Sequence, residues 1–173
     1  LHDVIPDIIT IGKPLGNGHP IAAVACTQKV AEGFNNGMEF FNTFGGNPVS
    51  CAIAKTVLEV IEHEKLQENS LVVGNFLKTN LLELSSKYSI IGSVRGQGLF
   101  LGVEFVNKQL QPLAEQADYF VNRMKSYGIL LSTDGPDHNV IKIKPPLVFS
   151  MQNAKDFLKY FTLVLQEDLM LSN

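Results

Sequence analysis

The chain has 173 residues, of which 45% are hydrophobic and 18% are charged, so it can bury a core without a metal or a disulfide. Its formal net charge is −3 and its Lys and Arg residues are scattered, which argues against nucleic-acid binding. No apolar run is long enough to cross a membrane, and no signal-peptide pattern is present.

The first third of the chain alternates between apolar runs and helix-forming segments. The elements expected there are a strand within 3–11, a strand within 20–27 and a helix at 27–34 with Thr27 as its N-cap. A longer helix is expected from Asn47 to about residue 64. Asn is a favoured N-cap, and Pro48 suits the first helical position because its missing N–H would be unpaired there. The apolar positions expected on one face of this helix are Val49, Ile53, Val57, Val60 and Ile61.

The rest of the chain changes its periodicity near residue 88, which predicts a mixed α and β unit. The elements expected are helices at 65–87, 113–128 and 151–171 and strands within 89–106, 129–132 and 139–144. The two strands of 89–106 would be joined at the sequence RGQG, where glycines suggest a turn. The chain therefore divides into residues 1–62, whose own core is incomplete, and an α+β unit at 63–173.

Lys13 lies between the strand-like ITIG and a loop rich in Gly and Pro, and this position raises a chemical question. A phosphate-binding P-loop is excluded because its lysine follows the glycines, whereas Lys13 precedes Gly16. A solvated surface lysine is the simplest interpretation. Pro14 is expected to hold Lys13 in extended geometry, and the glycines around Asn17 would admit a close ligand. A lysine held in this way could form a Schiff base with an aldehyde.

Four segments, in order, resemble the class-III aminotransferases, which are fold-type-I enzymes dependent on pyridoxal 5′-phosphate. They are PDIITIGKPLGNGHPIAAV, FNTFGGNPVSCA, SVRGQGLFLGVEF and IKIKPPLVFS. The resemblance implies an α/β fold in which 1–62 ends the large cofactor-binding domain, with the Schiff-base lysine loop and a long inter-domain helix. Residues 63–173 would then form the small C-terminal α+β domain. It also implies that the N-terminal half of the family lies outside these 173 residues, so this portion alone is expected to be inactive.

The resemblance also assigns roles to two residues near the start of the chain. Lys13 would carry the internal aldimine with pyridoxal 5′-phosphate and then act as the base at the substrate Cα. Thr43 matches a threonine whose hydroxyl reaches the cofactor phosphate of the neighbouring subunit, which implies a homodimer with a shared active site. The alternative for Thr43 is a hydroxyl that bonds its own turn.

The last motif departs from the common family pattern. Many class-III aminotransferases carry an arginine three residues before the Pro-Pro pair, where it grips an α-carboxylate. Lys142 occupies that position and lacks the planar two-bond fork of arginine. The segment looks most like phospho-lyases that act on ethanolamine phosphate or 5-phosphohydroxy-lysine. Lys142 and Lys144, which would share a strand face, could hold the leaving phosphate; solvated lysines are the alternative.

The reaction class stays open at this point, since the same chemistry at Lys13 serves transamination or β-elimination of phosphate from an amino-alkyl phosphate. A catalytically silent fragment or an interaction module is the remaining alternative. His19 is expected to be a hydrogen-bonded loop histidine, and Arg95 a structural residue. Asp134 and Asp137 are expected to be turn formers.

Cys26 and Cys51 each lie in an apolar stretch, so they are expected to be buried free thiols in a reducing compartment. The cytoplasm is the location this predicts. The histidines and cysteines show no spacing typical of metal ligands, and no metal is expected.

Overall fold

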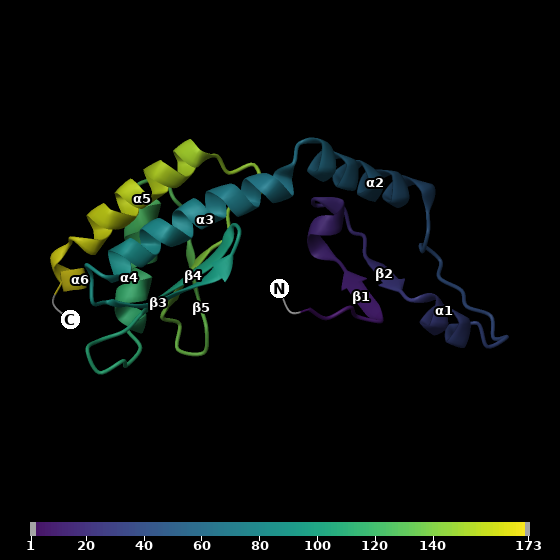
Figure 1. Ribbon diagram of the computed structural model, residues 1–173, viewed down its shortest axis with the longest axis horizontal. Helices are drawn as coiled ribbons and strands as arrows, with labels where there is room; N and C mark the ends of the chain where they lie inside the picture. Colours follow the sequence, from purple (N-terminus) through teal and green to yellow (C-terminus); the bar gives the residue numbers. More distant parts are fainter. Residues whose placement is uncertain (1–2, 172–173) are drawn as a thin grey trace. The chain divides into compact units, whose positions relative to one another are not determined.

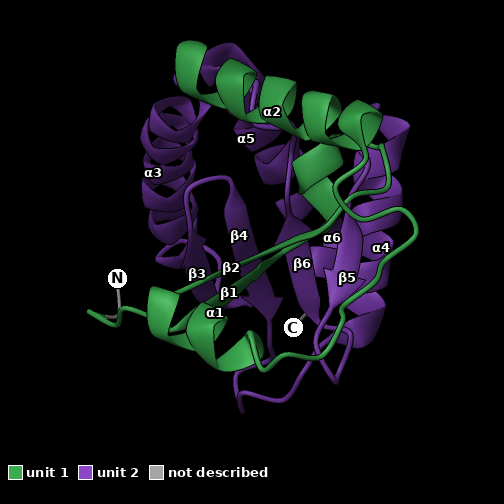
Figure 2. Ribbon diagram, turned by 90° about the vertical axis from the view of Figure 1, so that its right-hand side faces the viewer, with its two compact units in different colours: residues 1–64 green, residues 65–173 purple. Residues whose placement is uncertain are grey.

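A computed structural model describes residues 3–171 of the chain. The chain divides into two compact units, Leu1–Glu64 and Lys65–Asn173, which Figure 2 draws in different colours. Each unit is mixed α and β (Figure 1). We refer to them as the first and the second unit.

The first unit contains a two-stranded antiparallel sheet, a 3-10 turn and two helices. Its elements are β1 Ile8–Ile11, η1 Lys13–Gly16, β2 Ala23–Cys26, α1 Gln28–Phe34 and α2 Pro48–His63. The register of the sheet runs from Ile8 opposite Cys26 to Ile11 opposite Ala23. The strands are shorter than the apolar runs that predicted them, because the pairing extends only over Ile8–Ile11 and Ala23–Cys26.

The predicted start of α2 is confirmed. The side-chain oxygen of Asn47 accepts a hydrogen bond from the backbone N–H of Ser50 at 2.9 Å, and Pro48 occupies the first turn. Thr27 precedes α1 as predicted, but its side chain makes no capping bond. Its hydroxyl oxygen is buried and has no partner among residues 3–171.

The first unit buries little of its apolar surface. Val49 and Val60, on the predicted apolar face of α2, are 67% and 42% exposed, and Ala54 is the buried residue of this helix. Cys26 and Cys51 are free thiols, but the prediction that they are buried is wrong, since both are exposed. The apolar runs that contain them are therefore not covered within residues 3–171.

The second unit contains a four-stranded antiparallel sheet with strand order β3-β4-β6-β5. Its elements are α3 Leu66–Ser85, β3 Ile91–Gln97, β4 Phe100–Phe105, α4 Ala114–Ser126, β5 Ser132–Asp134, β6 Val140–Ile143, α5 Met151–Leu165 and α6 Asp168–Leu171. The strand predicted at 129–132 is wrong in position. The backbone N–H of Ile129 bonds the carbonyl of Met124 at 3.0 Å, so this residue completes the end of α4 and pairing in β5 begins at Ser132.

One face of this sheet packs on helices, and the other carries charged side chains together with Phe100 and Val140. Leu101, Val103 and Ile141 are almost fully buried on the helix-covered face, against α3 and α4 (Figure 1). α5 packs on both of these helices and adds Phe161 to the same core. Because side chains alternate along a strand, Gly102, Arg95 and Lys142 fall on the opposite face. The second unit thus has its own core and presents a face with charged side chains.

The α3 helix lies unusually close to the turn between β3 and β4. A Cβ atom at Gly74 would stand 2.1 Å from the backbone carbon and oxygen of Gly98, so a side chain at position 74 is excluded. The hydroxyl of Ser70, one turn earlier, accepts the N–H of Leu99 at 3.1 Å. The two strands are joined at the end of RGQG, as predicted, but its first three residues belong to β3. Gly98 and Leu99 form the turn, which α3 contacts.

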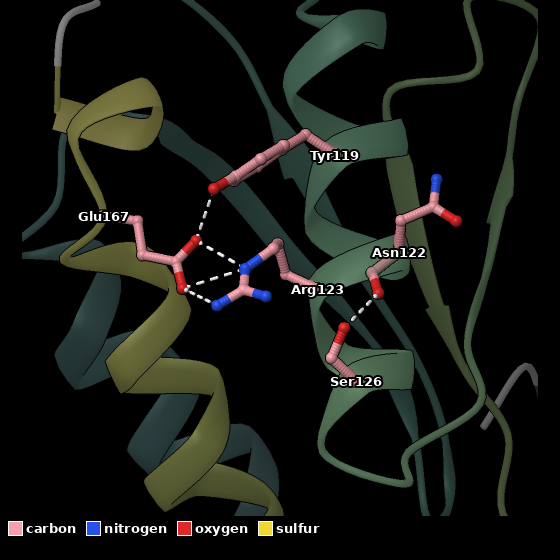
Figure 3. Close-up of polar contacts among 5 residues, drawn as sticks. All are labelled: Tyr119, Asn122, Arg123, Ser126 and Glu167. Carbon is pink, nitrogen blue, oxygen red and sulfur yellow. Dashed lines mark hydrogen bonds and ion pairs between the residues drawn. The ribbon is translucent and has the colours of Figure 1, made fainter.

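A polar network joins α4 to the junction of α5 and α6 (Figure 3). Arg123 donates a two-pronged set of bonds to the carboxylate of Glu167, the shortest being 2.8 Å, and Tyr119 donates to the same carboxylate at 2.5 Å. Arg123 lowers the pKa of the Glu167 carboxyl below its usual 4.5, while Glu167 raises the pKa of Tyr119 above its usual 10.0. The predicted single helix 151–171 is interrupted at this carboxylate.

We expect this network to make unfolding pH-dependent. A carboxyl whose pKa is lowered in the folded state stabilises it fully above its unfolded value, and this contribution is lost as the pH falls through the folded pKa. Glu167→Gln should therefore destabilise the chain near neutral pH and lose less stability than wild type on acidification. Urea unfolding at about pH 7 and about pH 3.5 measures the difference.

Glu83→Gln, at an exposed position of α3, is the matched control and should behave as wild type at both pH values. An equal loss of stability on acidification in wild type and Glu167→Gln would contradict the assignment.

Candidate active site

The Lys13 loop makes a sharp turn directly after β1. Lys13 has a positive φ of 46° and begins the 3-10 turn η1, while the next two residues after Pro14, Leu15 and Gly16, are buried. The prediction of extended geometry at Lys13 is therefore wrong. The ring of Pro14 fixes its own φ near −65°, so the chain reverses at Lys13 instead. A left-handed φ costs a non-glycine residue about 1–2 kcal/mol, and strain of this kind clusters at functional sites.

The side chain of Lys13 is exposed and forms no ion pair within residues 3–171. Its amine is therefore available to a ligand. A free primary amine on a rigid backbone is the group that Schiff-base formation with an aldehyde needs.

Thr43 lies in a turn that a neighbouring side chain closes. The side-chain oxygen of Asn42 accepts the backbone N–H groups of Phe44 at 3.2 Å and Gly45 at 3.0 Å. Thr43 is exposed, and within residues 3–171 its hydroxyl makes no hydrogen bond, so this hydroxyl does not hold the turn. Gly46 follows with a φ of 68° and open space where a Cβ would lie. The turn therefore offers a hydroxyl donor and an uncrowded backbone.

These groups suit a phosphorylated aldehyde such as pyridoxal 5′-phosphate. The amine of Lys13 matches the aldehyde, and the hydroxyl of Thr43 can donate to phosphate oxygens. Both residues belong to the first unit.

His19 is a hydrogen-bonded loop histidine, as predicted. Its Nε2 atom lies 2.8 Å from the hydroxyl oxygen of Ser50, near the start of α2. Ser50 also receives a bond from the side-chain amide of Asn47 at 3.0 Å. No sequence signal indicated this contact, since 31 positions separate His19 from Ser50.

Lys142 lies in β6 and is paired with an acid. Its Nζ atom is 2.9 Å from the carboxylate of Asp134, with the two side chains 35% and 57% exposed. Lys142 and the backbone N–H of Gly135 lower the pKa of Asp134. The turn-forming role predicted for Asp134 is confirmed, because its side-chain oxygen accepts the backbone N–H of Gly135 at 2.8 Å. The same carboxylate is also the partner of Lys142.

Arg95 and Lys142 flank Gly102 in the sheet register and line a hollow of about 370 Å³. Arg95 bonds Glu104 at 2.7 Å and Ser93 at 2.5 Å, and it lowers the pKa of Glu104. Each cation of this hollow thus has its own carboxylate, and the structural role predicted for Arg95 agrees with its pairing. The register of β5 on β6, with Asp134 opposite Val140, places Asp134 and Lys142 on one face of the sheet.

Lys144 follows β6 and is exposed, with its Nζ atom 5.6 Å from the centre of the Phe100 ring. Lys142 and Lys144 line a second hollow of about 590 Å³ together with Ser132 and Pro145. The structure thus brings the two predicted lysines to one hollow of the second unit.

Within residues 3–171, no group of three or more His, Cys, Asp or Glu side chains is arranged to hold a metal ion. None of the described helices is long and apolar enough to cross a membrane.

Two curated relatives are similar to most of the chain. A Drosophila melanogaster protein named alanine-glyoxylate aminotransferase 2-like is 49% identical over 96% of this chain and 35% of its own length. A Caenorhabditis elegans protein named ethanolamine-phosphate phospho-lyase homolog 1 is 43% identical over 86% of this chain and 32% of its own. The chain therefore spans about a third of the length of these relatives.

Solved structures share the fold. A phospholyase from Arthrobacter in complex with phosphoethanolamine matches with a TM-score of 0.90 and 37% identity, over 94% of this chain and 39% of that one. An amine transaminase from an uncultivated Pseudomonas species, in its PLP-bound form, matches with a TM-score of 0.80 and 30% identity, over 92% and 38%. The family model for aminotransferase class-III matches residues 1–165. The chain belongs to the class-III aminotransferase family.

Proposed function

We propose that this chain is the lysine-bearing portion of a pyridoxal 5′-phosphate enzyme that acts on a primary amine, with Lys13 as the residue that binds the cofactor covalently. The observation that carries the proposal is the exposed amine of Lys13, which forms no ion pair within residues 3–171 and lies in the segment that the class-III family model covers. Its positive φ of 46° adds the backbone strain that clusters at functional sites.

The same proposal gives the two units their place in the protein. Residues 1–62 would end the large cofactor-binding domain, and residues 63–173 would form the small domain. The division between Glu64 and Lys65 and the separate core of the second unit support this assignment. We expect residues 1–173 alone to bind no cofactor, because they span about a third of the length of the Drosophila melanogaster relative.

Bound pyridoxal 5′-phosphate supplies an electron sink that makes the C–H bond next to the substrate nitrogen acidic. Lys13 would hold the cofactor, and its amine, once released by the substrate amine, would take the proton from that carbon. Thr43 would donate its hydroxyl to the cofactor phosphate of a neighbouring subunit, in a homodimer with shared sites. Its exposure supports a partner outside this chain.

For the substrate, we propose an amino-alkyl phosphate that loses phosphate by elimination. The carbon–oxygen bond to phosphate breaks, the electron pair leaves with phosphate, and water then releases ammonia and an aldehyde. Lys142, with Lys144 beside it, would stabilise the leaving phosphate. The compact lysine at this position and the similarity to a phospholyase bound to phosphoethanolamine support this reaction.

Transamination is the second candidate. It is favoured by the 49% identity to a relative named as an alanine-glyoxylate aminotransferase 2-like protein. In transamination, Lys13 would pass the proton to the cofactor. No leaving group would depart from the substrate, and no phosphate would be formed.

Product analysis on the full-length protein separates the two. We expect ethanolamine phosphate to yield inorganic phosphate and acetaldehyde in equal amounts, with no amino transfer to 2-oxo acids. Amino transfer without release of phosphate would overturn elimination and support transamination. The absence of both activities, in a protein that also takes up no cofactor, would overturn the enzyme assignment.

The location of the protein remains a prediction. The cytoplasm was predicted from the cysteines, and an Arabidopsis thaliana relative that is 46% identical over 91% of this chain is named as mitochondrial. We propose the cytoplasm, and microscopy of the full-length protein with a C-terminal fluorescent tag would test it.

A further inference from the structure

The loop that carries Lys13 is held at one end by β1 and at the other by a contact with α2. Within the loop, Asn17 N–H bonds the carbonyl of Pro14 and His19 N–H bonds that of Gly16, both at 3.0 Å. A Cβ at Gly16 would lie 2.8 Å from Ile21 and 3.3 Å from the Cβ of His19. The loop from Lys13 to His19 is thus closed by its own backbone bonds and packs tightly at Gly16.

The side chain of His19 leaves this loop and reaches the start of α2. Its Nε2 lies 2.8 Å from Ser50 Oγ, and both residues are partly buried. Ser50 Oγ already accepts one N–H from Asn47 at 3.0 Å. The hydroxyl hydrogen and the second lone pair of Ser50 remain free, so Ser50 can donate to or accept from His19.

Asn47 extends the connection to the turn that carries Thr43. Its side-chain amide donates to the carbonyl of Phe44 at 2.9 Å as well as to Ser50, and its oxygen caps α2. Phe44 is the residue after Thr43, and its N–H is held by Asn42. An unbroken chain of hydrogen bonds therefore runs from the Lys13 loop, through His19, Ser50 and Asn47, to the Thr43 turn.

We infer that His19 is a positioning residue, which through Ser50 fixes the Lys13 loop against the start of α2. The inference rests on the proposed role of Lys13 as the cofactor lysine. Reaction of an amine with a bound aldehyde depends on sub-ångström placement, so a loosened loop should slow attachment of the cofactor. The role needs only a hydrogen bond at Nε2, so a side chain that restores this bond should restore the function.

The test uses the full-length protein in four variants. His19→Phe keeps a ring but removes the bond, His19→Gln keeps a donor and an acceptor at similar reach, and Ser50→Ala removes the partner. The fourth variant combines His19→Phe with Ser50→Ala. Thr56→Ala is the matched control, because Thr56 lies on the same helix and its hydroxyl bonds only the backbone of Ala52.

The first measurement is hydrogen exchange of residues 12–19 without added cofactor. We expect His19→Phe and Ser50→Ala to speed exchange there about five- to tenfold, and His19→Gln and Thr56→Ala to leave it near wild type. The double variant should be no faster than either single one, because one bond is lost in each case. Unchanged exchange in His19→Phe, or additive effects in the double variant, would overturn the inference.

The second measurement is the rate at which pyridoxal 5′-phosphate becomes attached to Lys13, trapped with borohydride and read by mass spectrometry. We expect it to fall about tenfold in His19→Phe and to recover in His19→Gln. A lower melting temperature with an unchanged rate would show a purely structural role and overturn the inference. A wild-type protein that attaches no cofactor would overturn the proposed function, while hydrogen exchange would still decide whether the bond holds the loop.

Discussion

Replacing Lys13 with alanine in the full-length protein is expected to lower kcat by at least about 10³-fold, because it removes both the covalent anchor and the base. Lys13→Arg should be as inactive, since guanidinium keeps the charge but cannot form the Schiff base at neutral pH. Lys55→Ala is the matched control. Lys55 is exposed on α2 of the same unit, where it pairs with Glu59 at 3.4 Å.

The measurement pairs product release with borohydride trapping of the cofactor. Loss of both in Lys13→Ala, with normal activity in Lys55→Ala, is the expected outcome. Trapping of cofactor at another lysine in wild type would contradict the assignment of Lys13.

Mixing Lys13→Ala with Thr43→Ala, which we expect to be weakened by loss of one phosphate contact, tests the shared site as well. A dimer of Lys13→Ala and Thr43→Ala subunits would contain one site with both Lys13 and Thr43 intact, if Thr43 serves the neighbour. Activity should then exceed that of Thr43→Ala alone, up to about half of wild type per mixed dimer. If Thr43 serves its own subunit, no intact site forms and the mixture is no more active than Thr43→Ala alone.

Local sequence signals predicted the elements that depend on local bonds. Asn47 and Pro48 marked the start of α2 because a cap needs only the residues beside it. Gly128, with a φ of 78°, ends the α4 region as predicted. The boundary of β5 was missed because Ile129, although apolar and β-branched, uses its N–H to close α4.

Contacts between distant positions could not be predicted from spacing. His19 and Ser50 are 31 positions apart, and no periodicity connects a loop with a helix start. The backbone of Lys13 was mispredicted because the rule for residues before proline excludes the right-handed helical region but leaves positive φ as a strained option.

Burial in the first unit was mispredicted for a different reason. The spacing of apolar residues on α2 indicates which face of the helix is apolar, but it does not indicate which residues pack against that face. Val49 stays 67% exposed, and Cys51 is also exposed, within the described part of this chain. The chain spans about a third of the length of its relatives. We expect other segments of a full-length protein to cover this face.

The pairing of Lys142 bears directly on substrate choice. Asp134, at 2.9 Å, already partly neutralises the ammonium of Lys142. A substrate phosphate must therefore either displace the Asp134 carboxylate or bind the ammonium beside it. Asp134 is 57% exposed and lies at the end of β5, where its side chain has room to turn away. If Lys142 binds the substrate as proposed, we therefore expect the pair to favour a strongly charged anion over a weakly charged one.

Lys142→Ala is expected to lower kcat/KM for ethanolamine phosphate about 10²-fold, the usual loss for one charge-assisted hydrogen bond in a shielded site. Lys144→Ala, from the same hollow, should lower kcat/KM by a smaller factor of about threefold, because Lys144 is exposed and solvent screens its charge. Asp134→Asn, which removes the competing carboxylate, should lower KM for the phosphate substrate. Steady-state kinetics on the full-length protein measure all three. Equal losses in Lys142→Ala and Lys144→Ala would show a diffuse charge effect and remove the specific role of Lys142.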